Sequence, residues 1–144
     1  MGNRAVIAFS TEARAPAIYL HWNGGRASVQ GFLDAARELG MRSVPTAGRH
    51  EYRADYAPQA RCLDWIAQEV MARAFFGCDV GFTVYREEYG RADKDNGDNG
   101  TYILNPHDLS IDRRIYVRGG EEYDAAKQSE ITAHIMQRAP AFNG

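Results

Sequence analysis

The chain has 144 residues, of which 44% are hydrophobic and 25% are charged, and this composition predicts one ordinary domain over residues 1–144. Its 17 basic and 19 acidic residues give a formal net charge of −2, which argues against direct binding to duplex nucleic acid because duplex-coating proteins are far more basic. No apolar run approaches the roughly 18 residues of a membrane helix and the N-terminal residues lack a signal-peptide profile, so we expect a cytoplasmic protein without a membrane partner.

The N-terminal part of the chain predicts a β-hairpin that leads into a helix. Residues 4–9 are β-branched and apolar, and residues 17–22 alternate apolar side chains with Tyr19 and His21. The polar connection between these segments is too short for a crossover helix, so we expect the two strands to pair antiparallel. A glycine turn then opens residues 26–39, where apolar residues recur at helical spacing.

The middle of the chain predicts a loop, a helix and two further strands. Residues 41–57 show no clear periodicity and are interpreted as a structured surface loop. Residues 58–76 carry the strongest helical pattern of the chain. Residues 79–86 alternate like a half-buried strand, and extended structure resumes at residues 101–104. The segment 93–100 between them holds two Asn-Gly steps, which favour a hairpin turn.

The C-terminal part predicts one more strand and a last helix. Residues 113–118 alternate like a strand, and residues 121–138 form a helical pattern that we expect Pro140 to stop. Taken together, the elements predict an α+β fold, in which an antiparallel sheet of about five strands is flanked by two long helices and a C-terminal helix.

Neither a metal site nor a catalytic site is indicated by the motifs. Cys62 and Cys78 are not in a C-x-x-C spacing and are interpreted as buried thiols, and the four histidines lie in different elements. The acidic segment 93–100 suggests calcium, but counting from Asp93 places Leu104 at the twelfth position, where that loop needs a glutamate. We therefore expect a solvated turn, or a ligand contact through the side-chain amide of Asn96 or Asn99, with no cofactor.

Two features fit a phosphate-bearing ligand. The segment from Asn23 through Gly24 and Gly25 to Arg26 opens a helix, where backbone amides can approach an anion and a guanidinium adds a planar fork. The alternative is a tight turn in which Asn23 or Ser28 caps the helix. The second feature is the aromatic surface of the predicted sheet, on which a base can stack; each of its tyrosines can equally be half-buried packing. These tyrosines are Tyr85, Tyr89, Tyr102 and Tyr116, and nearby arginines for phosphate are Arg61, Arg113, Arg114 and Arg118.

The linear order of four segments resembles a family of small phage and prophage proteins. The segments are residues 2–7 (GNRAVI), 18–26 (IYLHWNGGR), 75–77 (FFG) and 95–102 (DNGDNGTY). The chain is most similar to the anti-Thoeris sponge family, phage proteins that trap cyclic ADP-ribose isomers made by bacterial TIR-domain sensors. That resemblance implies an α+β fold, a homo-oligomer with ligand pockets at subunit junctions, no catalysis and a location in the host cytoplasm.

The resemblance also implies a set of ligand-binding residues. Tyr85 matches the aromatic stacker, Asn96 or Asn99 the amide-bearing residue, and Arg61 and Arg113 the arginines. A second pocket, for cyclic oligonucleotides, matches the residues Gly24, Gly25 and Arg26. A one-residue change of register would exchange Arg113 for Arg114, because neighbouring side chains of a strand point to opposite faces.

The expected function is therefore the binding and sequestration of a cyclic nucleotide immune signal, without cleavage, by a phage-type anti-defence protein. Two alternatives stay open at this point. One is an anti-defence inhibitor that binds a protein, for example a CRISPR effector, and the other is an enzyme that cleaves the nucleotide. A structural or regulatory phage protein without a nucleotide ligand is the remaining interpretation.

Overall fold

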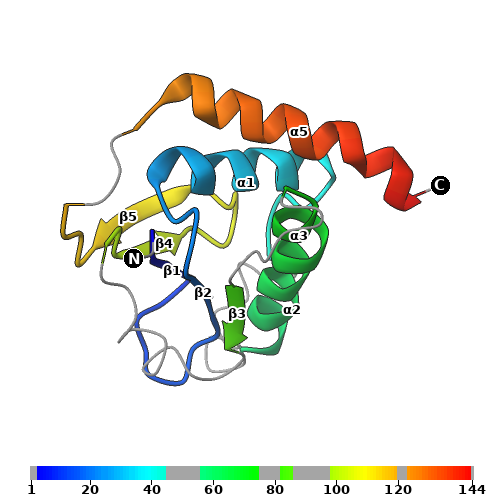
Figure 1. Ribbon diagram of the computed structural model, residues 1–144. Helices are drawn as coiled ribbons and strands as arrows, with labels where there is room; N and C mark the ends of the chain where they lie inside the picture. The colour runs from blue at the N-terminus through cyan, green and yellow to red at the C-terminus, as the bar shows by residue number, and fades with distance from the viewer. Residues whose placement is uncertain (1–2, 45–55, 75–81, 86–97, 120–122, 144) are drawn as a thin grey trace.

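The computed structural model describes residues 3–44, 56–74, 82–85, 98–119 and 123–143, apart from the side chains of residues 74, 82–85 and 138–143 (Figure 1). Its elements form a mixed α+β fold, which confirms the expected fold class. The sequence-predicted loop over residues 41–57 lies mostly outside the described residues.

The strands form one sheet in the order β3-β2-β1-β4-β5. Their bounds are β1 Ala5–Ala8, β2 Ala17–Leu20, β3 Phe82–Tyr85, β4 Thr101–Leu104 and β5 Ile111–Ile115. β1 and β2 pair antiparallel, which confirms the predicted hairpin. β1 and β4 pair parallel, with Val6 opposite Thr101, so the expectation of a purely antiparallel sheet is wrong.

The turn predicted over residues 93–100 does not join β3 to β4 as a hairpin. β3 lies at one edge of the sheet, and β2 and β1 separate it from β4. Because β2 is antiparallel to both β1 and β3, and β4 is parallel to β1, β3 and β4 run in the same direction and a tight turn cannot pair them. Of this segment the structure describes Asp98, Asn99 and Gly100, which lead directly into β4.

Two helical segments cover the same face of the sheet. They are α1 (Arg26–Glu38) and a continuous run made of α2 (Ala57–Ile66), a π-helical turn at Ala67–Met71 and α3 (Ala72–Ala74). Alternate strand residues point toward these helices, because side chains of a strand alternate between faces. The main core is built from the strand side chains Ala5, Ile7, Ile18, Leu20, Tyr102 and Leu104 and the helix side chains Val29, Phe32, Leu33, Leu63, Ile66 and Val70.

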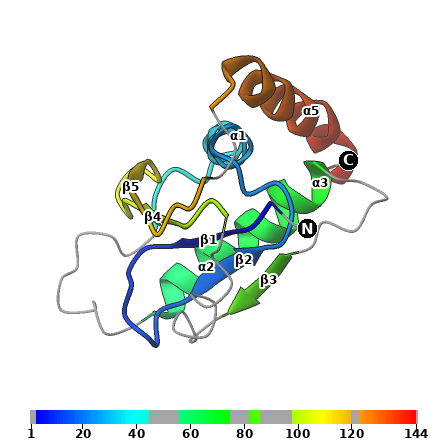
Figure 2. The ribbon, with the colours of Figure 1, turned by 60° about the vertical axis from the view of Figure 1, so that its left-hand side comes forward.

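The last helix, α5 (Ala125–Asn143), forms an outer layer on α1, as both ribbon views show (Figures 1 and 2). The predicted end of this helix at Arg138 is wrong, since the helix continues to Asn143. Pro140 therefore lies in the last turn of the helix, where its missing N–H removes one i→i−4 hydrogen bond. The sheet, the α1 and α2 layer and α5 are thus stacked in that order.

The thiol of Cys62 on α2 is buried, which confirms its interpretation as a core residue. Burial raises the pKa of this thiol to about 12, because an apolar environment disfavours the thiolate. Cys62 is therefore suited to packing and not to nucleophilic chemistry. Cys78 lies outside the described residues.

Candidate anion site at the start of helix α1

One end of the sheet brings together several segments that are distant in sequence. β1 and β4 begin at this end and β2 and β5 finish there, as the pairs Ala5–Leu20 and Thr101–Ile115 show. The chain enters α1 from β2 at the same end, and the segment after β5 leads from here to α5 (Figure 1). We call this region the α1-start end; it comprises residues 3–4, 21–26, 98–100 and 116–119 with Tyr123.

The glycine turn before α1 is held by buried backbone contacts. The Gly24 N–H donates to the Asn3 carbonyl at 2.7 Å, and the Gly24 carbonyl accepts a hydrogen bond from the Tyr102 hydroxyl at 2.7 Å. A Cβ at position 24 would lie 2.6 Å from the Asn3 oxygen and 2.7 Å from the Ala5 Cβ. Glycine is therefore required here by close packing, and the turn has a fixed position against β1 and β4.

The first turn of α1 has no side-chain cap and contains no acidic residue. Gly25 is the N-cap residue, with an extended backbone, and neither Asn23 nor Ser28 makes the capping hydrogen bond that the sequence offered as an alternative. Ser28 is fully buried, and its hydroxyl has no hydrogen-bond partner. The positive end of the helix dipole is thus uncompensated by side chains of the helix.

Arg26, the first residue of α1, adds a guanidinium group at this place. Its Cζ atom lies 5.3 Å from the centre of the Tyr123 ring, across the junction between α1 and the segment before α5. The Nε atom of Arg26 is buried without a hydrogen-bond partner. Within the part of the chain that the structure describes, no carboxylate pairs with this half-buried side chain. Arg26 therefore contributes a positive charge that the described residues leave unneutralised.

A second arginine, Arg114 on β5, packs on the face of the sheet that α1 covers. It lies opposite Tyr102 in the β4–β5 register, and its Cζ atom is 4.6 Å from the centre of the Tyr102 ring. Its Nη2 donates to the Asn99 carbonyl at 3.0 Å. The Tyr102 side chain thus connects Arg114 to the carbonyl of Gly24. The ligand set implied by the resemblance contained the neighbouring Arg113 and not Arg114. Of these two arginines, Arg114 is the one that lies opposite Tyr102 in the register of β5 against β4.

Asn99 also lies at the α1-start end, but its side chain is used within the chain. Its amide nitrogen donates to the Asn3 side-chain oxygen at 2.5 Å and to the Arg4 carbonyl at 3.0 Å, and the residue is fully buried. Next to it, Asp98 accepts hydrogen bonds from the backbone N–H and the Nε of Arg4. These bonds, the backbone one above all, hold the pKa of Asp98 below its ordinary value. Asn99 and Asp98 thus fix the segments that precede β1 and β4.

Three further residues of the predicted ligand set lie on other elements of the structure. Arg61 is exposed on α2, and Arg113 is exposed on β5. Tyr85 ends β3, at the sheet edge opposite β5, and its side chain lies outside the described residues. Asn96 lies outside them as well. The structure therefore places Gly24, Gly25, Arg26 and Asn99 at the α1-start end, and it places Arg61, Arg113 and Tyr85 on α2, β5 and β3.

Large apolar side chains are exposed at the same end. The four exposed ones of the described chain are Trp22, Tyr116, Val117 and Tyr123, with exposed fractions of 42%, 55%, 46% and 52%. Asn23 and Tyr116 both have left-handed backbone conformations, with φ of 62° and 60°. Such conformations cost free energy in residues other than glycine and often occur at functional sites. The α1-start end thus combines unneutralised positive charge with accessible aromatic surface.

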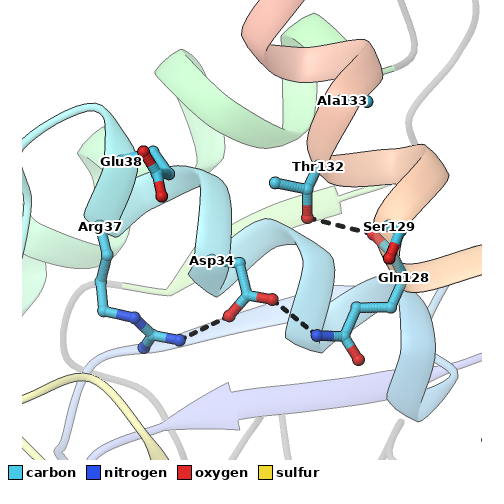
Figure 3. Close-up of a pocket in the computed structure, with 7 residues that line it drawn as sticks. All are labelled: Asp34, Arg37, Glu38, Gln128, Ser129, Thr132 and Ala133. Carbon is cyan, nitrogen blue, oxygen red and sulfur yellow. Dashed lines mark hydrogen bonds and ion pairs between the residues drawn. The ribbon is translucent and has the colours of Figure 1, made fainter. Parts of the chain in front are cut away.

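A separate pocket of about 430 Å³ lies between α1 and α5 (Figure 3). Its central group is Asp34, whose carboxylate accepts hydrogen bonds from Arg37 at 2.6 Å, Gln128 at 2.6 Å and Gln30 at 3.1 Å. Thr132 in turn donates to the Gly31 carbonyl at 3.3 Å. Because these polar groups bond to one another, we interpret this pocket as part of the junction that attaches α5 to α1.

No family model, curated protein or solved structure matches this chain in the comparisons. Among the described residues, no three His, Cys, Asp or Glu side chains are grouped so that they could hold a metal ion. No helix of that same part of the chain is both long enough and apolar enough to cross a bilayer.

Proposed function

We propose that this chain binds and sequesters a cyclic nucleotide signal, as a phage-type anti-defence protein, and that a phosphate of the ligand is held at the first turn of α1. The observation that carries the proposal is the half-buried Arg26 guanidinium beside an uncapped helix start, with no acid among the described residues to neutralise either. A phosphate supplies the missing negative charge, and backbone N–H groups of a first helical turn are suitable donors to it.

The aromatic surface supports a nucleotide over a simple anion. Trp22 and Tyr123 are half exposed at the same end of the molecule, and aromatic side chains bind nucleobases by stacking. Nanomolar retention of a signal needs about 12 kcal/mol of binding free energy, more than one surface turn provides. We therefore propose a homo-oligomer, in which a neighbouring subunit encloses the ligand, and a cyclic ADP-ribose isomer or a cyclic oligonucleotide as that ligand.

Storage is favoured over cleavage by the state of the ionisable groups at the α1-start end. The Asp98 carboxylate is bound by Arg4, and His21 Nδ1 shares a 2.8 Å hydrogen bond with the Tyr19 hydroxyl. The bonds from Arg4 hold the pKa of Asp98 below its ordinary value, which makes its carboxylate a weak general base. We propose that both side chains support the fold here and that the ligand is released intact.

Calorimetric titration of the full chain with cyclic ADP-ribose isomers and cyclic trinucleotides tests the proposal. Arg26→Gln removes a charge-assisted contact worth about 1.5 to 3 kcal/mol, so its dissociation constant should rise about 10- to 150-fold. Arg42→Gln, which removes an exposed arginine just beyond the other end of α1, is the matched control and should bind as the unchanged chain does. Equal binding by both variants would reject the proposed phosphate position.

Two further measurements complete this test. Mass spectrometry of the ligand recovered after heat denaturation should show it intact, whereas a cleaved product would establish the enzymatic alternative. Light scattering of the eluted protein at micromolar concentration should show an oligomer. A monomer under these conditions would remove the basis for a pocket between subunits.

A second candidate function is inhibition of a defence protein through direct contact. The observation that favours it is the exposed group Trp22, Tyr116, Val117 and Tyr123, because aromatic residues are enriched at protein interfaces. A surface of this kind needs no small ligand. Failure of every nucleotide in the titration, together with saturable binding of a purified CRISPR effector that is lost in Trp22→Ala, would establish this function in place of the first.

A further inference from the structure

We infer that the pocket between α1 and α5 is a binding site for a small primary ammonium ion, which is held at the Glu38 carboxylate (Figure 3). The inference does not depend on the proposed function, because none of the residues that line this pocket belongs to the α1-start end. With a volume of about 430 Å³, the pocket falls within the range of small-molecule sites.

The argument begins with the charges around the pocket. Its lining contains two carboxylates and one guanidinium, those of Asp34, Glu38 and Arg37. The Asp34 carboxylate is satisfied within the chain, because it accepts hydrogen bonds at 2.6 Å from both Arg37 and Gln128. Glu38 is exposed, and it forms no ion pair or hydrogen bond with the residues that the structure describes. The lining therefore carries one unneutralised negative charge, located on Glu38.

The position of Glu38 in its helix adds to this negative charge. Glu38 is the last residue of α1, at the end where the helix dipole is negative and a cation is the favourable side chain. The basic residue of the same turn, Arg37, pairs with Asp34 instead. A carboxylate at a helix C-terminus is thus opposed by the dipole, and such departures from local preference are expected at functional sites. A bound cation compensates for both the carboxylate and the dipole.

The oxygen atoms of the lining indicate which cation fits. The Thr132 hydroxyl already donates to backbone carbonyls, so toward a ligand its oxygen is an acceptor. The exposed Ser129 hydroxyl is a further acceptor in the same lining. With Glu38 these side chains provide three acceptors, which equals the number of N–H donors of a primary ammonium group. Thr132 and Ala133 also contribute methyl groups to the pocket, which suit a short aliphatic stem.

A metal ion is a less suitable occupant. Among the described residues, no three carboxylate, imidazole or thiol groups gather as a metal site would require. Calcium needs six to eight oxygen ligands and magnesium needs a near-ideal octahedron, whereas most oxygens of this lining are engaged in hydrogen bonds within the chain. We therefore assign an organic cation to the pocket.

The pocket is shared by two helices, so a ligand in it contacts both. Glu38 comes from α1, and Ser129, Thr132 and Ala133 come from α5, on the facing side of the pocket (Figure 3). A ligand that binds only the docked arrangement of two elements stabilises that arrangement. The bound ammonium ion should hold α5 against α1 in addition to the hydrogen bond between Asp34 and Gln128.

The experiment titrates the full chain with butylammonium chloride at one pH and ionic strength, and NMR records the backbone amide shifts. The reference ligand is 1-butanol, which has the same size and no charge. We expect butylammonium to shift the amides of Glu38, Ser129 and Ala133 in a saturable manner, and to bind about five-fold more tightly than 1-butanol. Hydrogen exchange of the α5 amides should become slower at saturation.

Two variants test the position of the ammonium group. Glu38→Gln should raise the dissociation constant of butylammonium about five-fold, which corresponds to the loss of one exposed ion pair. Ala133→Leu keeps the charge and fills the pocket from an exposed helix position, and it should weaken binding of both ligands. Glu130→Gln is the matched control, since it removes an exposed carboxylate of α5 that does not line the pocket, and it should bind as the unchanged chain does.

Two results would overturn the inference. One is equal binding of butylammonium and 1-butanol by the unchanged chain, a measurement that does not depend on whether any variant folds. The other is an equal loss of butylammonium binding in Glu38→Gln and Glu130→Gln, which would show that the cation responds to net charge and not to this pocket. The proposed function is tested separately, by cyclic nucleotides and Arg26→Gln at the other end of α1.

Discussion

Arg4 donates two hydrogen bonds to a single oxygen of Asp98, one from its backbone N–H at 3.0 Å and one from its Nε at 3.2 Å. The contact joins the residue that precedes β1 to the segment that precedes β4. These two strands are parallel neighbours in the sheet, so the pair fixes where their aligned ends begin. It also contributes to the stability of the fold in a way that depends on pH.

The first prediction concerns Asp98 and acid. Its pKa is lower in the folded chain than in the unfolded chain, so its contribution to stability is present above the unfolded value of about 3.9 and is lost as the pH falls through the folded value. Asp98→Asn should be less stable than the unchanged chain in urea at pH 7, and the two curves should converge in acid. Asp112→Asn, on the exposed part of β5, controls for the loss of one negative charge. A difference that stays constant with pH would contradict this account.

The second prediction concerns the support of the glycine turn. Tyr102→Phe removes the hydroxyl that donates to the Gly24 carbonyl and leaves a buried acceptor unpaired, so it should cost about 1 to 3 kcal/mol of unfolding free energy. Tyr116→Phe removes an exposed hydroxyl and should stay within about 0.5 kcal/mol of the unchanged chain. Urea unfolding of the three proteins measures both values, and equal stabilities would show that the hydrogen bond does not hold the turn.

The third prediction concerns the close approach of α1 and α5. A Cβ at Gly31 would lie 2.9 Å from the Ile131 Cγ2 and 3.1 Å from the Gln128 carbonyl oxygen. Gly31→Ala should therefore destabilise the chain by about 1 to 3 kcal/mol through overpacking. The sign is diagnostic, because a glycine to alanine change inside a helix ordinarily stabilises by roughly 0.5 to 1 kcal/mol. Hydrogen exchange of α5 amides should accelerate in this variant, and a stabilised variant would mean that the helices are not in contact here.

The fourth prediction concerns the reactivity of Cys62. Burial and a pKa of about 12 leave little thiolate at pH 8, so iodoacetamide should not alkylate Cys62 in the folded chain within an hour. The same thiol should react fully in urea. The experiment uses Cys78→Ser, so that mass spectrometry counts a single site. Rapid alkylation of the folded chain would show that α2 opens from the sheet.

Local patterns predicted the elements that are determined by neighbouring residues. The alternation after Pro16 and the short connection before it were enough for the β1–β2 hairpin, and helical spacing with a glycine turn placed the start of α1 at Arg26. Both depend on periodicity within about a dozen residues. The pairing of β1 with β4 depends on contacts between Val6 and Thr101, which no local pattern encodes, so the parallel pair was not predicted.

The residues of the candidate site also fall into two groups, those that a local sequence pattern identifies and those that only the tertiary structure places. The Gly24, Gly25 and Arg26 segment could be identified because a turn, a helix start and an arginine are adjacent in sequence. The sequence allows the Asn99 side-chain amide to contact a ligand. It does not show that this amide donates to the Asn3 side chain and the Arg4 carbonyl in the folded chain. The choice between Arg113 and Arg114 depends on the register of β5 against β4, which the tertiary structure sets.

The parallel pair also determines when the fold can be completed during synthesis. β1 is an inner strand, and its β4-facing edge pairs with residues 101–103. A nascent chain that has released β1, β2 and α1 from the ribosome therefore displays an open row of backbone donors and acceptors until β4 emerges. At about 5 to 20 residues per second that wait lasts seconds, during which an unpaired strand edge of this kind is prone to aggregation.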